Sequence, residues 1–429
     1  MKKLKIFIKT FGCTLNQSDS EVMAGFLVKA GHKMVDSVEN ADLVLFNTCI
    51  VKDNTEKKFF SELDKMNNIN KKVVVAGCIP QSEQHDVRLK NVSLLGVKSL
   101  DKIVDVVEET AAGNIVRILK DSKNPRLNLP KVRKNNVVEI IPLNIGCLGA
   151  CSYCKTRFAR GQLMSYDIKA IKKQFENAVK DGVKEIWLTS QDTGAYGKDI
   201  GSNLPVLLKE LLSIKGFKGV NDDYKIRLGM LNPDHALVFV DELAELFKHP
   251  NMFKFAHLPV QSGSNKILKL MNRKYKVEDF VRIVKILRKE IPDITIATDI
   301  ISGFPGETED DFEKTCRLLQ ELKIPVVNMT KFSPRQGTRA FKMKRVPTKT
   351  VKKRSKGLVN LQAKIITNNE WIGWKGKIII DEIGKNNSML GRNEFYKLVA
   401  IKNCKLKIGS IVEVKVKRVK QNYLEAELV

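Results

Sequence analysis

Short apolar runs of strand length alternate with segments of helical spacing over residues 1–112. The runs KLKIFIKT, ADLVLFNT and KKVVVAG are rich in β-branched and other apolar side chains. Between and after them, NQSDSEVMAGFLVKAG, NTEKKFFSELDKM and LDKIVDVVEET repeat apolar residues at helical spacing. Such alternation is typical of a parallel sheet covered by helices, so we expect an α/β, Rossmann-like domain here.

The alternation resumes after a polar, proline-containing stretch at residues 119–136, which we interpret as a linker. Six further strand-like runs begin with VVEIIP, EIWLTS, YKIRLG, FKFAHL, ITIATD and VVNMTK, and helical patterns separate them. Six strand–helix units favour a partial (β/α)6 barrel at residues 133–364 over a complete eight-unit barrel. Residues 367–429 change to short alternating runs broken by Gly, Asn and Lys, which predict a small antiparallel β-barrel.

The charge of the chain indicates a polyanionic partner. Lys and Arg number 75 against 48 acidic residues, a net charge of +27. From Lys342 to Lys364 there are nine basic residues and no acidic one. We expect nucleic acid to bind there, with Lys352, Lys353 and Arg354 contacting phosphates. The alternatives are a generally basic composition and a solvated helix face.

Hydropathy gives no sign of a membrane segment. No apolar run approaches the ~18 residues that can span a bilayer. The apolar N-terminal stretch is interrupted by Lys5 and Lys9, which fits a strand better than a signal peptide. We therefore expect a cytoplasmic protein without a membrane partner.

Three cysteines lie close together in GCLGACSYCK, and they carry the clearest chemistry. Cys147, Cys151 and Cys154 follow the first strand of the predicted barrel, and the next cysteine is Cys316. A tetrahedral zinc site would need a fourth ligand nearby. Three thiolates instead suit a 4Fe–4S cluster whose fourth iron stays open to a substrate or cofactor.

Three more cysteines each follow a strand of the N-terminal sheet. Cys13, Cys49 and Cys78 come directly after KLKIFIKT, ADLVLFNT and KKVVVAG. Carboxyl ends of parallel strands share one edge of a sheet, so these thiols should gather. The alternative is three buried small apolar residues. Cys316 and Cys404 are interpreted as structural.

Other strand ends of the predicted barrel carry small and polar residues. DIISGFPGET, QDTGAYG and PVQSGS each follow a strand. Glycines there let a backbone approach a ligand closely. Together with the cysteine loop they indicate a cradle for a small-molecule cofactor.

The CxxxCxxC loop resembles the signature of radical S-adenosylmethionine enzymes. The three spaced N-terminal cysteines, GCLGACSYCKTRFARGQLMSY, GFPGE and the terminal barrel are similar to the methylthiotransferase family within that group. CSYCKTRFARGQLMSY, EIWLTSQDTGAYGKDIG, RLGMLNP and ITIATDIISGFPGETEDDF most resemble its archaeal and eukaryotic branch, which modifies threonylcarbamoyladenosine in tRNA. The resemblance covers nearly the whole chain.

The resemblance implies two 4Fe–4S clusters, S-adenosyl-L-methionine and a tRNA substrate. Cys147, Cys151 and Cys154 would hold the cluster whose open iron binds S-adenosylmethionine, and cleavage of that cofactor would give the radical that activates carbon 2 of the adenine. Cys13, Cys49 and Cys78 would hold a second cluster that presents the sulfur to be inserted, and a second S-adenosylmethionine would supply the methyl group. An unidentified donor would supply electrons, and the terminal TRAM barrel would bind RNA.

The family's glycine-bearing loop and polar strand end correspond to three further positions in this chain. Gly303, Gly306 and Gln191 would lie near S-adenosylmethionine.

Two alternatives share some of these features. A methylthiotransferase acting on isopentenyladenosine tRNA, or on an aspartate of a small-subunit ribosomal protein, would carry the same six cysteines. A non-enzymatic zinc or iron–sulfur RNA-binding module would explain the charge and the cysteines but not the six strand ends around the open trio.

Overall fold

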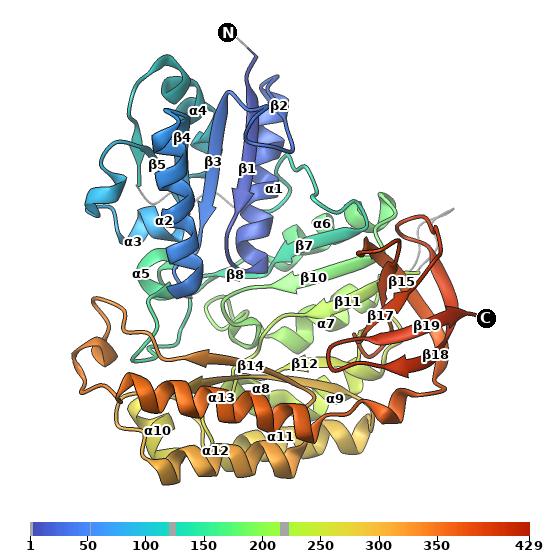
Figure 1. Cartoon of the computed structure of the whole chain (residues 1–429). Coiled ribbons are helices and arrows are strands. Elements are labelled where there is room, and N and C mark those ends of the chain that lie inside the picture. Colours follow the sequence, from blue (N-terminus) through green and yellow to red (C-terminus); the bar gives the residue numbers. More distant parts are fainter. Residues whose placement is uncertain (1–2, 52, 120–125, 215–222) are drawn as a thin grey trace.

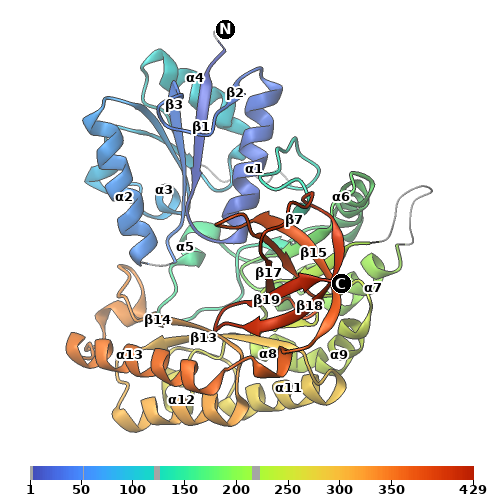
Figure 2. The same ribbon diagram turned by 45° about the vertical axis from the view of Figure 1, so that its right-hand side comes forward.

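The computed structural model describes the chain except residues 1–2, 52, 120–125 and 215–222. The N-terminal sheet lies above a central half-barrel, and a small closed barrel lies beside the half-barrel (Figures 1 and 2). Part of the expected linker, residues 120–125, falls outside the described residues.

Six parallel strands form the N-terminal sheet in the order β2-β1-β3-β4-β5-β6, which confirms the expected parallel sheet. The strands are β1 Lys5–Thr10, β2 Lys33–Met34, β3 Leu43–Thr48, β4 Lys72–Gly77, β5 Ser93–Gly96 and β6 Arg117–Ile118. The helices are α1 Thr14–Lys29, α2 Asp53–Asn68, α3 Cys78–Ser82 and α4 Ile103–Ala112. Alternate residues of the central strands face opposite ways: Leu45 packs with α1 and α4, whereas Phe46 packs with α2. Both faces are therefore buried, as a parallel sheet requires.

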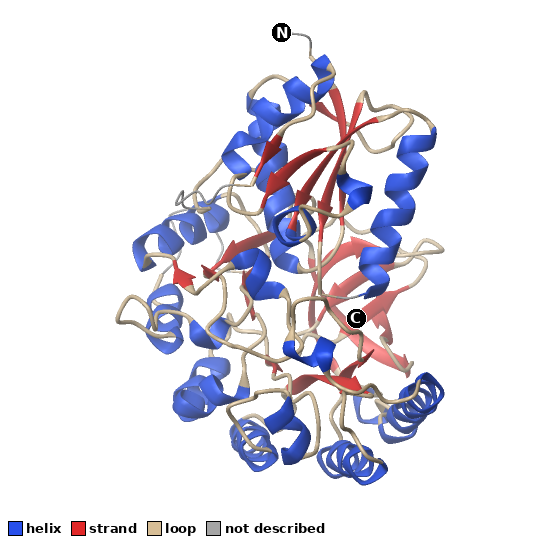
Figure 3. Ribbon diagram, turned by 90° about the vertical axis from the view of Figure 1, so that its left-hand side faces the viewer, coloured by secondary structure: helices blue, strands red, loops and turns tan. Residues whose placement is uncertain are grey.

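The central domain contains all six expected strands, each parallel to its neighbours. They form two arcs, β11-β10-β7 and β12-β13-β14, and an isolated bridge between Ile226 and Met252 links the arcs. The strands are β7 Val138–Pro142, β10 Glu185–Thr189, β11 Lys225–Leu228, β12 Phe255–His257, β13 Thr295–Ser302 and β14 Val326–Lys331. The covering helices are α6 Ile168–Lys180, α7 Leu204–Leu212, α8 Pro233–Ala236, α9 Val240–Lys248, α10 Asn265–Leu270, α11 Val277–Glu290, α12 Glu309–Leu322 and α13 Thr348–Ile365. These helices lie outside the strands (Figure 3), so side chains facing inwards remain available for a site.

The terminal domain is a closed barrel of five strands in the order β15-β16-β17-β19-β18. Its strands are β15 Lys375–Ile383, β16 Met389–Arg392, β17 Leu398–Ile401, β18 Ile411–Val419 and β19 Leu424–Leu428. Four pairings are antiparallel as expected, but β17 and β19 pair in parallel. A closed ring with an odd number of strands cannot alternate direction all the way round, so one parallel pair is unavoidable.

The connection between the first two domains is packed, not loose. A side chain at Gly25 of α1 would place its Cβ 2.2 Å from the Pro130 carbonyl carbon, so the segment presses directly on the helix. Lys131 bridges Glu21 of α1 at 3.1 Å and Glu139 of β7 at 2.7 Å. The described part of the expected linker therefore fixes the domains against each other.

A buried ion pair lies at the centre of this domain contact. Arg160 ends α5 (Thr156–Arg160) of the central domain, yet its guanidinium enters the N-terminal domain and is only 1% exposed. It contacts Asp19 of α1 at 2.8 Å and donates a hydrogen bond to the Asn16 side-chain oxygen at 3.0 Å. Arg126 binds the other Asp19 oxygen. Because buried charges are tolerated only when paired, the two domains have to meet here in one register.

Replacing Arg160 by Met should destabilise the protein strongly, because Asp19 would remain buried with only Arg126 to compensate it. We expect the free energy of unfolding, measured by urea titration of the full chain, to fall by about 3 kcal/mol. Arg317→Met is the matched control: Arg317 lies on the surface, 3.9 Å from Asp310, and should cost less than about 1 kcal/mol. Equal effects of the two variants would contradict a special role for the buried pair.

Candidate active site

The three cysteines of the GCLGACSYCK loop lie beyond the carboxyl end of β7, after the short strand β8 (Asn144–Ile145). The loop turns at Gly146, where φ is +77° and a Cβ would lie 1.8 Å from the Gln162 carbonyl oxygen, so only glycine fits. A Cβ at Gly149 would lie 3.3 Å from the Cys147 sulfur and 3.8 Å from the Cys151 sulfur. The thiols of Cys147 and Cys151 therefore both lie close to Gly149.

The environment of these thiols favours the neutral form in the absence of a metal group. Burial raises the pKa of Cys147 to about 12, and the neighbouring Asp192, Cys154 and Cys151 raise it further. Burial, followed by the charge of Cys151, also raises the pKa of Cys154. Thiols with raised pKa values, such as those of Cys147 and Cys154, ligate a metal group only as thiolates, whose charge the metal compensates. The donor set therefore fits an iron–sulfur cluster held by three thiolates.

The second trio lies at the carboxyl ends of three adjacent strands. Cys13 follows β1 as the N-cap of α1, Cys49 follows β3, and Cys78 follows β4 as the first residue of α3. A Cβ at Gly12 would lie 2.8 Å from the Cys49 sulfur, so this glycine lets the chain pass close to the thiol. Burial raises the pKa of Cys49 to about 12, with contributions from Cys13 and Cys78. The three thiols thus form one electrostatically interacting group.

Within the described part of the chain, no three His, Cys, Asp or Glu side chains converge closely enough to hold a single metal ion. A 4Fe–4S cluster binds each thiolate on a different iron, so its ligands stand farther apart than those of a single ion.

Arg160 connects the segment that carries the first trio with the second trio. This arginine lies six positions after Cys154, and its guanidinium hydrogen-bonds the Cys78 thiol. Ala159 packs with Cys78, Ile50 and Val97. Helices α3 and α5 lie side by side in Figures 1 and 2. The sequence pattern did not identify Arg160, because a lone arginine in a polar loop usually lies on the surface.

A network of hydrogen bonds connects Cys151 of the first trio to polar side chains of the central domain. Arg273 donates a hydrogen bond to the Cys151 sulfur at 3.2 Å, binds the Asn232 side-chain oxygen and donates to the Tyr275 hydroxyl at 3.0 Å. Asn232 in turn donates to Asp192 at 2.6 Å. Hydrogen bonds to ligating sulfurs orient a cluster and tune its potential. The sequence analysis identified QDTGAYG as a strand end and RLGMLNP as part of the family resemblance, but nothing in either segment predicted these contacts.

Two amide side chains near the strand ends have unpaired polar atoms. The Gln191 side-chain oxygen is buried without a protein partner. Asn144, which is fully buried next to the cysteine loop, pairs neither its oxygen nor its nitrogen. Buried polar atoms of this kind usually await a ligand or water. Asn144 was missed in the sequence, where an asparagine after a strand is unremarkable.

The two glycines of the GFPGE turn have different surroundings. At Gly303, where φ is +76°, a Cβ would lie 2.4 Å from a Val351 methyl of α13, and its N–H donates to Glu307 at 2.8 Å. At Gly306, φ is +86° and the nearest side chain is Leu270. The observed contacts of Gly303 explain its glycine by helix packing. A role of either glycine near a cofactor stays a prediction.

The basic segment on α13 is only partly a solvent-facing surface. Lys352 and Lys353 are exposed. Arg354 is 5% exposed and binds Glu307 at 2.8 Å and Glu309 at 2.9 Å. The expectation that Arg354 contacts phosphate is therefore wrong, because its guanidinium forms ion pairs within the central domain.

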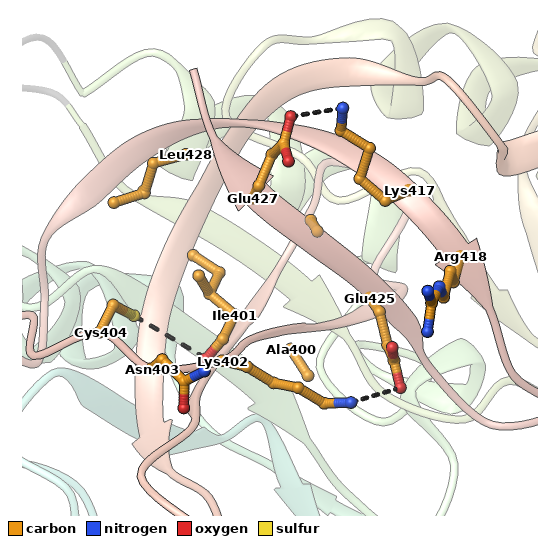
Figure 4. Close-up of a pocket in the computed structure, with 11 residues that line it drawn as sticks. Ala400, Ile401, Lys402, Asn403, Cys404, Lys417, Arg418, Glu425, Glu427 and Leu428 are labelled. Carbon is orange, nitrogen blue, oxygen red and sulfur yellow. Dashed lines mark hydrogen bonds and ion pairs between the residues drawn. The ribbon is translucent and has the colours of Figure 1, made fainter.

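The terminal barrel offers basic side chains around a shallow pocket of about 380 Å³ (Figure 4). Lys402 is paired with Glu425 at 3.1 Å, and Lys417 is paired with Glu427 at 2.6 Å. Arg418 lies on the same surface. The local excess of positive charge is thus smaller than the number of lysines suggests. No helix in the described portion of the chain is long and apolar enough to cross a membrane.

Comparison with known families divides the chain into three matching regions. Residues 5–96 match an uncharacterized protein family (UPF0004), residues 141–319 match the radical SAM superfamily, and residues 375–429 match the TRAM domain. Among solved structures, the chain is similar to the radical S-adenosylmethionine methyltransferase TsrM from Kitasatospora setae. The TM-score is 0.57 at 13% identity, covering 79% of this chain and 75% of that one. This likeness shows the shared fold alone.

Curated relatives are similar over the full length. The threonylcarbamoyladenosine tRNA methylthiotransferase of Homo sapiens is 42% identical over 99% of this chain and 74% of its own. The probable threonylcarbamoyladenosine tRNA methylthiotransferase of Pyrococcus horikoshii is 40% identical over 99% of this chain and 100% of its own. At this identity and coverage, the chain belongs to the threonylcarbamoyladenosine tRNA methylthiotransferase family.

Proposed function

We propose that this protein inserts sulfur and a methyl group at carbon 2 of N6-threonylcarbamoyladenosine in tRNA. The observation that carries this function is the pair of cysteine trios at the strand ends of two domains, joined through the buried side chain of Arg160. An electron donor not yet identified would serve it in the cytoplasm. The working units would be residues 1–112 for the second cluster, 133–364 for the radical chemistry and 367–429 for RNA.

Cys147, Cys151 and Cys154 would hold the radical 4Fe–4S cluster. When bound, this cluster and S-adenosylmethionine supply the one-electron chemistry that activates an inert C–H bond. The chain's own residues hold that group in place. Arg273 donates to the Cys151 sulfur and offsets the negative charge of the thiolates. The unpaired amides of Gln191 and Asn144 are suited to polar contacts with the cofactor, and Gly303 and Gly306 would flank it.

Cys13, Cys49 and Cys78 would hold a second 4Fe–4S cluster that presents the sulfur. Their position at three adjacent strand ends supports this role, because one loop from each strand can contribute a thiolate. Arg160 would donate a hydrogen bond to the Cys78 sulfur from the loop that bears the first trio. The same side chain would thereby orient the second cluster towards the first.

The test of this function is the nucleoside composition of tRNA. Cells that lack their own enzyme and express this chain should gain 2-methylthio-N6-threonylcarbamoyladenosine, detected by mass spectrometry of digested tRNA. Cys151→Ala should give none, because two thiolates cannot hold the radical cluster. Cys316→Ala, on helix α12, should retain the product as the matched control. A 2-methylthio group on isopentenyladenosine instead would replace the proposed substrate.

Cys49→Ala should separate the two trios functionally. Without the second cluster, the anaerobically reconstituted enzyme should still cleave S-adenosylmethionine to 5′-deoxyadenosine but should form no methylthio product. Its iron content should fall by about half relative to the unmodified chain, since one of two clusters of equal iron content is lost. Full product formation by this variant would indicate that Cys13, Cys49 and Cys78 serve only in packing.

Lys352 and Lys353 should contribute to tRNA binding through phosphates. Replacing both by Gln should weaken tRNA binding and reduce the slope of log affinity against log salt by about 0.7 to 0.9 per lost contact. The double variant Lys285→Gln/Lys289→Gln on α11 removes the same charge from another exposed surface and serves as control. Equal losses in both double variants would indicate that only net charge matters.

A further inference from the structure

A cavity of about 640 Å³ lies between the inner wall of the half-barrel and the terminal barrel. Strands β11 to β14 contribute Arg227, Phe255, His257 and Asn328 to its lining, and the terminal domain contributes Arg392 and Tyr396. Helix α13 also contributes to the lining through Val359 and Gln362. The cavity is larger than packing requires, and it combines two arginines with aromatic rings.

Arg227 points into this cavity because of the alternation of β11. Its neighbours Ile226 and Leu228 are buried in the core beneath the outer helices, so Arg227 faces the inside of the half-barrel. Its guanidinium lies 5.7, 5.3 and 5.1 Å from the ring centres of Trp187, Phe255 and Tyr396, respectively. Its Nε is buried without a hydrogen-bond acceptor. The aromatic rings contact the guanidinium but leave its Nε donor without a hydrogen-bond acceptor.

Two buried acidic groups near Arg227 make their closest polar contacts with other side chains. Burial raises the pKa of Glu185 to about 7, and burial raises that of Asp381 to about 6. Asp381 lies 3.8 Å from Arg392, and Glu185 accepts a hydrogen bond from Trp187 at 2.8 Å. Neither carboxylate lies within ion-pair distance of Arg227 among the interactions of the described residues. An anion in the cavity would therefore meet an available guanidinium.

Tyr396 gives a second indication that the cavity wall is specialised. It lies in the turn between β16 and β17 with φ of +59°, a left-handed conformation that bulky residues rarely adopt. Its ring packs 4.9 Å from Phe253 and 4.9 Å from Phe255. Backbone strain of this kind persists where the side chain has a specific task. Here the ring lines the cavity, and its centre lies 5.1 Å from the guanidinium of Arg227.

Polar side chains of the neighbouring strands line the cavity together with Arg227. His257 and Asn328 are part of the lining. Both contact Asp299: the His257 ring nitrogen lies 3.1 Å from its carboxylate, and Asn328 donates to it at 2.8 Å. A ligand group that carries both amide and carboxylate functions would therefore find polar partners beside the arginine.

We propose that Arg227 binds the free carboxylate of the N6-threonylcarbamoyl group on the substrate adenosine, so that the cavity selects this base. This inference rests on the proposed function and adds the residue that reads the substrate. Guanidinium and carboxylate match as paired donors and acceptors. An isopentenyl group has no carboxylate and would leave the arginine unpaired, and sites built for a polar group reject analogues that lack it.

The test compares two substrates that differ only at the carboxylate. Reconstituted full-length enzyme is assayed with tRNA bearing N6-threonylcarbamoyladenosine and with the same tRNA bearing its methyl ester. The unmodified chain should show a KM about 10- to 100-fold lower for the acid than for the ester. Arg227→Gln should raise the KM for the acid to that of the ester and leave the KM for the ester nearly unchanged. Arg227→Lys should restore part of the preference.

The matched control is Arg418→Gln, which removes an exposed arginine from the terminal barrel outside this cavity. It should affect the acid and the ester by the same factor, as a phosphate contact would. A preference for the acid that persists in Arg227→Gln, or an equal loss on both substrates, overturns the inference. If the unmodified enzyme converts neither tRNA, the proposed function itself fails, and this outcome is distinct from the others.

Discussion

The buried contact of Arg160 with Asp19 and Cys78 determines how the first two domains meet. A guanidinium withdrawn from water requires a compensating carboxylate, and Asp19 supplies it from α1 at 2.8 Å. Since α5 begins two residues after Cys154, the arginine that reaches Cys78 belongs to the loop of the other trio. The short helix α5 therefore adds a second link between the domains, beside the packed connection at Lys131.

A second constraint comes from the incomplete barrel. Six strands leave its inner surface open, and inward-facing polar side chains such as Arg227 and Trp187 would otherwise be exposed to water. The terminal barrel covers part of this surface with the β16–β17 turn, where Lys254 donates to the Glu394 carbonyl at 2.7 Å. The domain that resembles an RNA-binding module is thus also a wall of the central cavity.

The sequence predicted those features that depend on local periodicity. Strand patterns located all six strands of the half-barrel and the three strands that end at Cys13, Cys49 and Cys78, because strand direction and end are encoded within a few residues. Arg160, Arg273 and Asn144 were not identifiable in this way. The partners Asn16 and Asp19 of Arg160 lie more than 140 positions away, and burial of a charge depends on tertiary contacts that no local pattern records. The same limit explains why Arg354 looked like a phosphate contact.

Three of these residues are arginines inside the protein. The net charge of the chain therefore differs from the charge at its surface. Arg160, Arg273 and Arg354 are inside the protein, each paired with carboxylates, amides or sulfurs, whereas Lys352 and Lys353 are exposed. The guanidinium is less strongly hydrated than an ammonium group and offers its donors in a planar fork, so it is the cation that tolerates burial. A charge of +27 therefore overstates the surface available to RNA. These three arginines form polar contacts inside the protein, whereas Lys352 and Lys353 keep their charge at the surface.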